Sequence, residues 1–365
     1  MRKNMNWIKN ISVLLISILI SLFICELVLG YLKPIDLRSD PKWVPDGFTR
    51  GHYLPNETIQ GSVGHNVRNP NLRIESAEYT LNKYGYRGSD WNILSPKSIA
   101  FYGGSSTFSF HDNDEDAWPF ITINCLNKNQ EIQYQNLNFS HPGNSIFDAP
   151  HLLLQKGIHF NSDWIITYHL WNDIKFIRAL SENSDFIFNT NPSDSSITLK
   201  SVLLDLGIFH NLLGNINVIY RKFINRSYES SFDLTKNVNI KESDIDSTLS
   251  IIKDNYVALI NLSSPSQKFL FIKQGLLLDE NNNSYDAEIS WELIGLNKVE
   301  FLKVQSDYYS MIDSLAKDNA NVYFLDADKI IPKNLEMYDD HVHLQRKAQK
   351  ILGESVCEYI KKINI

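Results

Sequence analysis

Five residues in four distant stretches of the chain have the groups that acyl transfer needs: Ser105, Gly143, Asn172, Asp340 and His343. A serine hydroxyl is a weak nucleophile until a neighbouring base accepts its proton, and His343 is the candidate base. Asp340 stands three residues earlier, so its carboxylate can hold the imidazole in the required tautomer and stabilise the imidazolium. The backbone N–H groups of Ser105 and Gly143 and the side-chain amide of Asn172 are candidate oxyanion donors. The set predicts a Ser-His-Asp triad with an oxyanion hole.

Ser105 follows a short apolar run and a pair of glycines, a pattern typical of a buried strand that enters a tight turn. Ile99 to Tyr102 is the apolar run, and Gly103 and Gly104 let the backbone turn sharply. A serine there lies at the carboxyl end of a strand, where open α/β sheets bind their ligands. Ser106 is the rival nucleophile, but Ser105 follows the glycines directly. By itself, the stretch also fits an ordinary strand-to-helix turn.

His341 is a second histidine on the loop that carries the candidate base. Only His343 stands three residues after an aspartate that can orient it, because the same offset from Asp339 leads to Val342. We therefore expect His343 to be the base, and His341 to be a loop residue or a substrate contact.

From residue 97 onward, the apolar pattern alternates between strands and helices. Strands are expected over 98–102, 133–139, 163–169, 268–273 and 321–326, and helices over 118–128, up to about 157, 290–317 and 344–362. Strands separated by helices form a parallel sheet with helices on both faces. Because the carboxyl ends of parallel strands meet at one edge, the candidate residues should converge on a single crevice.

The first 33 residues are interpreted as a membrane anchor. Basic residues precede an apolar stretch from Ile11 to Leu32, which Glu26 interrupts. The stretch has no A-x-A-like site for a cleaved signal peptide, and Ile24 is not the small residue that a lipoprotein signal needs before Cys25. We therefore expect a retained single-pass anchor over 1–33, through which the protein contacts the membrane, with the remaining chain outside the cytoplasm.

Two further segments depart from the α/β pattern. Residues 34–96 are rich in Pro, Gly, Asn and aromatics, which predicts an extended lead-in with short hairpins. Within a domain that spans 97–365, residues from about 174 to 267 are first polar and then helical in periodicity, over 202–223 and 245–262. We interpret them as a helical insertion that caps the site.

Charge and composition exclude several kinds of function. The net charge of -7 argues against a nucleic-acid binder, which needs a basic face. The three cysteines, Cys25, Cys125 and Cys357, are few and far apart, and predict neither a disulfide framework nor a metal site. The acidic run 112–116 resembles a calcium loop but lacks its glycine and its final glutamate, so helix capping and solvation are expected. No metal or organic cofactor is predicted, and nothing indicates the oligomeric state.

The four stretches together resemble the SGNH hydrolase family, also called GDSL-type esterases. The blocks are 103–107, with Gly-Gly-Ser for the family's Gly-Asp-Ser; 138–145; 171–173, with Leu170 in place of a frequent glycine; and 340–344, a good match to D-x-x-H. The resemblance covers the chain from about residue 97, apart from the insertion. It implies Ser105 as nucleophile, Gly143 and Asn172 as oxyanion donors, and Asp340 and His343 as orienter and base. It also implies a flavodoxin-like three-layer α/β/α sandwich.

The lead-in looks like the membrane-anchored bacterial branch of that family, because Asn82 to Gly88 stands ahead of the Gly-Gly-Ser block. Members of that branch are often linked to modification of envelope polysaccharide. The resemblance implies a serine esterase for a small acyl ester, such as acetyl on an envelope glycan. Three alternatives stay open: an O-acyltransferase with the same residues, a lysophospholipase close to the membrane, and a non-catalytic glycan-binding or assembly protein. An open polar pocket above Ser105 would favour a glycan, and a deep apolar slot would favour a lipid.

Overall fold

The computed structural model describes residues 43–44, 52–60, 77–109, 111–128, 130–181, 238–281 and 283–364, with scattered helical residues between Val13 and Val28. The chain divides into two units, one of 1–37 with 191–233 and one of 38–190 with 234–365. The anchor predicted over 1–33 lies mostly outside the described residues. Within the described part of the chain, no helix has the length and apolar character needed to cross a membrane. The anchor therefore stays a prediction.

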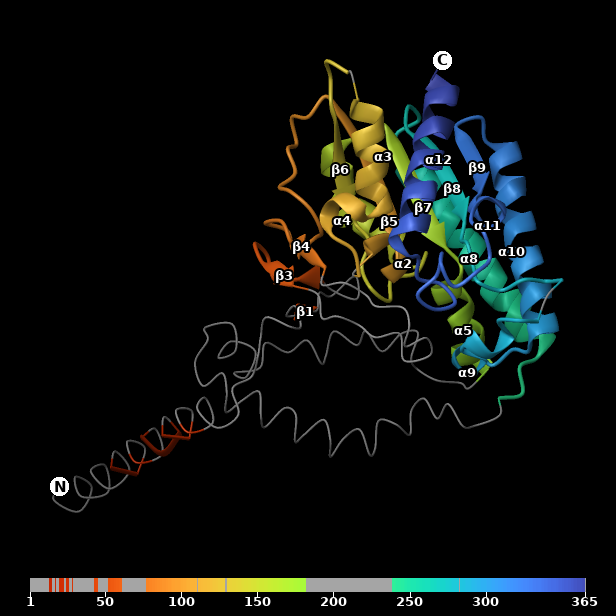
Figure 1. Ribbon diagram of the computed structural model, residues 1–365, viewed down its shortest axis with the longest axis horizontal. Coiled ribbons are helices and arrows are strands. Elements are labelled where there is room, and N and C mark those ends of the chain that lie inside the picture. Colours follow the sequence, from red (N-terminus) through yellow and green to blue (C-terminus); the bar gives the residue numbers. More distant parts are fainter. Residues whose placement is uncertain are drawn as a thin grey trace, which may run out of the picture. The chain divides into compact units, whose positions relative to one another are not determined.

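A five-stranded parallel sheet organises the second unit (Figure 1). The strands lie in the order β6-β5-β7-β8-β9, which is 2-1-3-4-5 in chain order and is the flavodoxin-like arrangement. They are β5 (Lys97–Gly103), β6 (Tyr134–Asn138), β7 (Trp164–His169), β8 (Lys268–Lys273) and β9 (Val322–Asp326). β5 pairs with β6 on one side and with β7 on the other, so it is central. The predicted parallel α/β architecture is confirmed.

Alternate residues of β5 pack into two separate cores, because successive side chains of a strand point to opposite faces. Ile99 and Phe101 pack with residues of α3 (Trp118–Asn127) and α12 (Arg346–Asn364). Ala100 and Tyr102 pack with residues of the helices on the opposite face, which are α4 (Ala149–Gln155), α8 (Glu242–Leu262) and α10 (Lys298–Asp318). Burial on both faces explains the unbroken apolar run in this strand. The result is three layers, with α3 and α12 on one side of the sheet (Figure 1).

Short elements complete the described part of the chain. Two antiparallel pairs lie in the lead-in, β1 (Trp43–Val44) with β2 (His52–Tyr53) and β3 (Thr58–Gln60) with β4 (Glu78–Thr80). The short helices are α2 (Ser105–Phe108), η1 (Asp114–Asp116), η2 (Gly157–Phe160), η4 (Asp286–Glu288), α9 (Trp291–Ile294) and α11 (Ala327–Ile330).

The single helix expected over 290–317 is two helices. α9 ends at Gly295, which has a φ of 70°, a left-handed conformation that favours glycine. α10 then starts afresh behind Asn297, whose side chain accepts from the Glu300 N–H while the Glu300 carboxylate accepts from the Asn297 N–H. This capping box supplies partners for the free N–H groups of the new helix.

Both ends of the insertion expected over about 174–267 belong to the α/β domain itself. α5 (Trp171–Ser181) follows β7 directly, and α8 places Ile252, Tyr256 and Leu259 in the core on the Tyr102 side. A helix between two parallel strands is the usual crossover connection. The expected boundaries were therefore too wide. Residues 182–237, which include the helical pattern over 202–223, lie outside the described residues, and the expected cap lies there with them.

The cysteine prediction was wrong, because Cys125 and Cys357 form a disulfide. Cys125 is on α3 and Cys357 is on α12, and these two helices pack on the same face of the sheet. The partners are 232 residues apart in the chain, so no local spacing could reveal the pair.

Arg87 of the lead-in is fully buried and binds the turn that follows α2. Its guanidinium donates to the carbonyl oxygens of Phe108, Ser109 and Asp112 and to the Asp114 carboxylate. The lead-in therefore holds in place the turn that follows α2, the helix that begins with Ser105.

The acidic run 112–116 does not cap α3, contrary to the prediction. The N-cap of α3 is Ala117, with no side-chain cap, and Asp112 is buried.

Candidate active site

Ser105 is the first residue of α2 and follows β5 after Gly104. The two glycines before it are required by space and not by an unusual backbone angle, since φ at Gly104 is -87°. A Cβ at Gly103 would lie 2.0 Å from the Thr107 hydroxyl oxygen, and a Cβ at Gly104 would lie 2.5 Å from the side-chain nitrogen of Asn172. The two glycines thus let the first turn of α2 fold back closely over the end of β5 and let Asn172 approach the backbone beside the serine.

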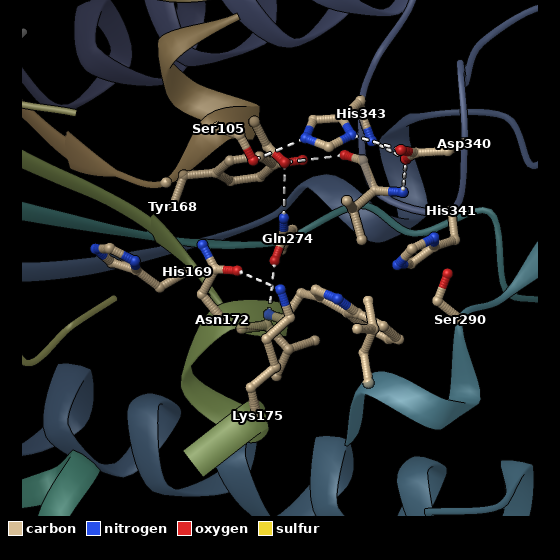
Figure 2. Close-up of a pocket in the computed structure, with 16 residues that line it drawn as sticks. Ser105, Tyr168, His169, Asn172, Lys175, Gln274, Ser290, Asp340, His341 and His343 are labelled. Atoms are coloured by element: carbon tan, nitrogen blue, oxygen red, sulfur yellow. Dashed lines mark hydrogen bonds and ion pairs between the residues drawn. The ribbon is translucent and has the colours of Figure 1, made fainter. Parts of the chain in front are cut away.

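The structure brings Ser105, His343 and Asp340 into one hydrogen-bonded chain (Figure 2). His343 Nε2 lies 2.7 Å from Ser105 Oγ, and His343 Nδ1 lies 2.6 Å from Asp340 Oδ2. The second carboxylate oxygen of Asp340 accepts the backbone N–H groups of Val342 and His343, each at 2.8 Å. These bonds fix the carboxylate relative to the imidazole. The arrangement allows the histidine to take a proton from the serine while its other nitrogen donates to the aspartate.

The charge of Asp340 controls the protonation of His343. Burial by itself favours the neutral imidazole, but the carboxylate and its hydrogen bond outweigh burial and raise the pKa of His343 above its ordinary value. For Asp340, burial acts to raise the pKa, but the interactions with His343 outweigh it, so the pKa lies well below the usual range. The aspartate therefore stays ionised and stabilises the imidazolium that forms when the serine attacks.

Two of the three predicted oxyanion donors lie at the cavity. Ser105 and Asn172 both line it. Asn172 is the second residue of α5, and its Nδ2 donates to the Asn144 carbonyl at 2.9 Å. Gly143 stands one residue before Asn144 with a φ of 87°, which explains why this position is a glycine. It is not among the residues that line the cavity, so its role as a donor stays a prediction.

The side chain of Ser106 is occupied by structural hydrogen bonds. Its hydroxyl donates to the Val342 carbonyl at 3.0 Å and accepts from Gln274 Nε2 at 3.1 Å. The other end of Gln274 accepts the backbone N–H of Trp171 at 3.0 Å. Ser106 thus ties α2 to the loop that carries His343, while Ser105 alone of the two faces the imidazole.

His341 does not take the place of His343. It is buried and lies edge-on to Trp171, with ring centroids 4.2 Å apart, on the wall of the cavity. The neighbouring carboxylate of Asp339 pairs with His111 Nδ1 at 3.2 Å. Each of the two aspartates on this loop therefore has its own imidazole partner.

The Asp173 carboxylate joins the loop after β6 to the helix layer. It accepts the Ile146 N–H at 2.8 Å and the Tyr308 hydroxyl at 2.7 Å. Tyr308 in turn is 2.8 Å from the Tyr256 hydroxyl. These bonds hold the start of α5, and hence Asn172, against the loop that contains Gly143.

Sequence reasoning missed three polar residues that line the cavity: His169, Lys175 and Gln274. Gln274 directly follows β8, and His169 ends β7. The expectation that polar residues at the carboxyl ends of parallel strands converge on one crevice would therefore also have found them. Burial lowers the pKa of His169 to about 3, which leaves its ring uncharged at neutral pH. Lys175 lies one helical turn after Asn172, and only a helix that starts at that point brings the two together.

The cavity has a volume of about 230 Å³, and its lining exposes about equal polar and apolar surface. Its polar side chains include Lys175, Gln274, Ser290 and His341, and its apolar ones include Leu293.

Among the described residues, one cluster of potential metal ligands is found, and its members, Cys125, Cys357 and Glu358, do not line the cavity. The disulfide leaves that cluster without a thiolate, which is the form of cysteine that binds metals.

Comparisons with known proteins give remote structural likenesses. No family model and no curated protein matches the sequence. Among solved structures, the chain is similar to an acetyl xylan esterase, AlAXEase, with 14% identity over 72% of this chain and 99% of that one, at a TM-score of 0.42. A catalytic mutant of Axe2, an acetylxylan esterase from Geobacillus stearothermophilus, has 11% identity over 73% and 94% of the two chains, at a TM-score of 0.41. For a GDSL-like lipase from Bacteroides thetaiotaomicron, the values are 12%, 73%, 89% and 0.36. The solved structures that this chain resembles thus include GDSL-like lipases and acetyl xylan esterases.

Proposed function

We propose that this protein is a serine esterase of the SGNH type that removes a small acyl group, such as acetyl, from an O-acylated glycan of the cell envelope. One observation carries the proposal: His343 lies within hydrogen-bonding distance of Ser105 Oγ through one nitrogen and of Asp340 through the other. Ser105 lies 235 or more positions before Asp340 and His343 in the sequence, so only folding brings the three residues together.

The reaction follows from the geometry. As Ser105 Oγ bonds to the ester carbonyl carbon, its proton passes to His343 Nε2, and the carbonyl oxygen becomes an oxyanion. The Ser105 N–H and the Asn172 amide stabilise that oxyanion. His343 then protonates the departing alcohol, which leaves an acyl-enzyme on Ser105. A water molecule repeats the sequence with His343 as base, releasing the carboxylic acid and restoring the serine hydroxyl.

The cavity supports a small acyl group on a polar carrier. Lys175, Gln274, Ser290 and His341 place charged and hydrogen-bonding groups around the nucleophile. A long lipid chain needs an extended apolar surface, which this lining of the described residues does not offer. The small volume of the cavity, about 230 Å³, and the hydrogen-bonding groups on its wall therefore favour a glycan ester over a lysophospholipid.

The disulfide between Cys125 and Cys357 supports a location outside the cytoplasm. Disulfides persist in oxidising compartments and are rare where thioredoxin and glutathione keep thiols reduced. Together with the apolar segment at the start of the sequence, this favours an anchored enzyme that faces the envelope.

The test uses the full-length protein in detergent, with p-nitrophenyl acetate as substrate. Ser105→Ala should abolish hydrolysis and labelling by a fluorophosphonate probe, whereas Ser314→Ala, at an exposed serine on α10 whose hydroxyl donates to Asp318, should retain both. Hydrolysis that persists in Ser105→Ala would refute the proposal. With an acetylated glycan as donor and a second sugar as acceptor, release of free acetate supports hydrolysis, and an acetylated acceptor supports transfer instead.

A further inference from the structure

We infer that Lys175 is a positioning residue for the oxyanion hole, which it serves by holding the side-chain amide of Asn172 in the one orientation that aims an N–H at the reacting carbonyl. The inference rests on the proposed function and extends it to a residue outside the four motif blocks. Lys175 lies on α5 three residues after Asn172, so both side chains are on one face of the helix.

The Asn172 amide is fixed from both ends. Lys175 Nζ donates to Asn172 Oδ1 at 3.1 Å, and Asn172 Nδ2 donates to the Asn144 carbonyl oxygen at 2.9 Å. An ammonium group can only donate and a carbonyl oxygen can only accept, so a flipped amide would lose both bonds. Figure 2 shows the amide oxygen of Asn172 turned toward Lys175 and its nitrogen turned away from it.

This orientation leaves one N–H of the amide for the substrate. The Nδ2 group has two hydrogens, and the Asn144 carbonyl accepts one of them. Asn172 lines the cavity beside Ser105, where the oxyanion forms. If the amide flipped, an oxygen would face the developing negative charge and oppose the reaction. Lys175 therefore adds to transition-state stabilisation through the Asn172 amide.

The positive charge of Lys175 also acts on the amide itself. A cation at the amide oxygen draws electron density from the nitrogen, which makes its N–H a stronger donor, as in other charge-assisted hydrogen bonds. The same charge reaches the triad, since Lys175 acts to lower the pKa of His343. Loss of the charge should therefore be visible in the pH profile as well as in the rate.

The experiment measures kcat and KM for p-nitrophenyl acetate with the full-length protein in detergent. Lys175→Met should lower kcat about tenfold and leave KM within about twofold, because only the transition state uses the oriented amide. Lys175→Arg should restore most of the rate, since guanidinium also donates to the amide oxygen. Lys298→Met is the control: Lys298 Nζ also donates to an asparagine side-chain oxygen, Asn283 Oδ1, at 2.6 Å, in addition to its ion pair with Asp286 at 3.0 Å, and it does not line the cavity.

Two readouts separate positioning from a merely structural role. In an Asn172→Ala background, Lys175→Met should cost almost nothing further, because the amide through which it acts is gone. In the wild-type background, Lys175→Met should move the acid limb of kcat/KM to higher pH, because the removed charge disfavours protonation of His343. In the Lys298→Met variant, the acid limb of kcat/KM should stay at its wild-type pH.

Three results would overturn the inference: a full tenfold loss that persists in the Asn172→Ala background, a loss confined to KM, or a Lys175→Met variant with wild-type kcat. Ser105→Ala is measured in parallel. If that variant still hydrolyses the ester, the proposed function falls and the inference falls with it. If it is inactive, the Lys175 results bear on the positioning role alone.

Discussion

Replacing Asp340 by asparagine should damage the site more than removing its side chain. One carboxylate oxygen of Asp340 accepts the backbone N–H groups of Val342 and His343, at 2.8 Å each, and the other faces His343 Nδ1 at 2.6 Å. In Asp340→Asn the two backbone donors hold the amide oxygen in the first position, so the amide NH₂ must face His343 Nδ1. Nδ1 then has to accept, and the neutral imidazole carries its proton on Nε2.

That tautomer cannot take a proton from Ser105, because Nε2 is the atom that lies 2.7 Å from Ser105 Oγ. We expect kcat to fall about 10³- to 10⁴-fold, the scale found when a triad aspartate is replaced in this way. The loss corresponds to about 4–5.5 kcal/mol of barrier. Asp340→Ala also loses the orienting bond, but it leaves Nδ1 free to keep the productive tautomer. We therefore expect the alanine variant to retain at least about tenfold more activity than the asparagine variant.

The assay is the pH dependence of kcat/KM for p-nitrophenyl acetate between about pH 5 and 9, with thermal melts to show that each variant is folded. In Asp340→Ala the acid limb should lie at lower pH than in the wild type, because the carboxylate that raises the pKa of His343 is gone. An asparagine variant within about tenfold of the wild type, or one more active than the alanine variant, would refute the tautomer argument.

The wild-type kcat/KM should fall below an acid limb centred above about pH 6.5, because the neutral form of His343 is the base and its pKa is raised; a limb centred well below 6.5 contradicts this. Gly104→Ala should lower kcat about 10²-fold in a folded protein, since the added Cβ would lie 2.5 Å from the Asn172 amide nitrogen; unchanged kinetics would exclude that crowding. Cys125→Ser should lower the free energy of unfolding by about 2–5 kcal/mol, measured by urea denaturation, with kcat preserved at low temperature, because the bridge closes a long loop away from the cavity. A stability equal to that of the wild type would argue against the bridge.

Local pattern was sufficient for the sheet. The strand expected over 268–273 is β8 with the same bounds, and the run from Ile99 to Tyr102 lies inside β5. A strand that is buried on both faces is an unbroken run of apolar residues, so a short window of sequence contains the whole apolar pattern that predicts it. The break between α9 and α10, in the single helix expected over 290–317, was missed, although Gly295 and the Asn297–Glu300 capping box mark it within a few residues.

The parts that could not be predicted depend on packing between distant segments. The pairing of Cys125 with Cys357 depends on two helices that meet across the fold. The buried role of Arg87 depends on a lead-in that folds against the turn after α2. Neither contact produces a repeating pattern in the sequence, because each depends on single residues in two segments that are distant along the chain.

By itself the sequence determined which residue types could do the chemistry, and that Ser105, Gly143 and Asn172 follow predicted strands while Asp340 and His343 precede the last helix, because residue spacing and apolar periodicity are local properties. The spacing also favoured Ser105 over Ser106 and His343 over His341, but only the tertiary structure shows Ser105 Oγ within hydrogen-bonding distance of the His343 imidazole, with Ser106 and His341 turned to other partners. It also placed the Lys175 ammonium on the Asn172 amide, next to the carbonyl of Asn144. Those contacts depend on the directions in which single side chains point at the interfaces between segments. That direction is set by close packing and hydrogen-bond geometry, which exist only once the chain has folded.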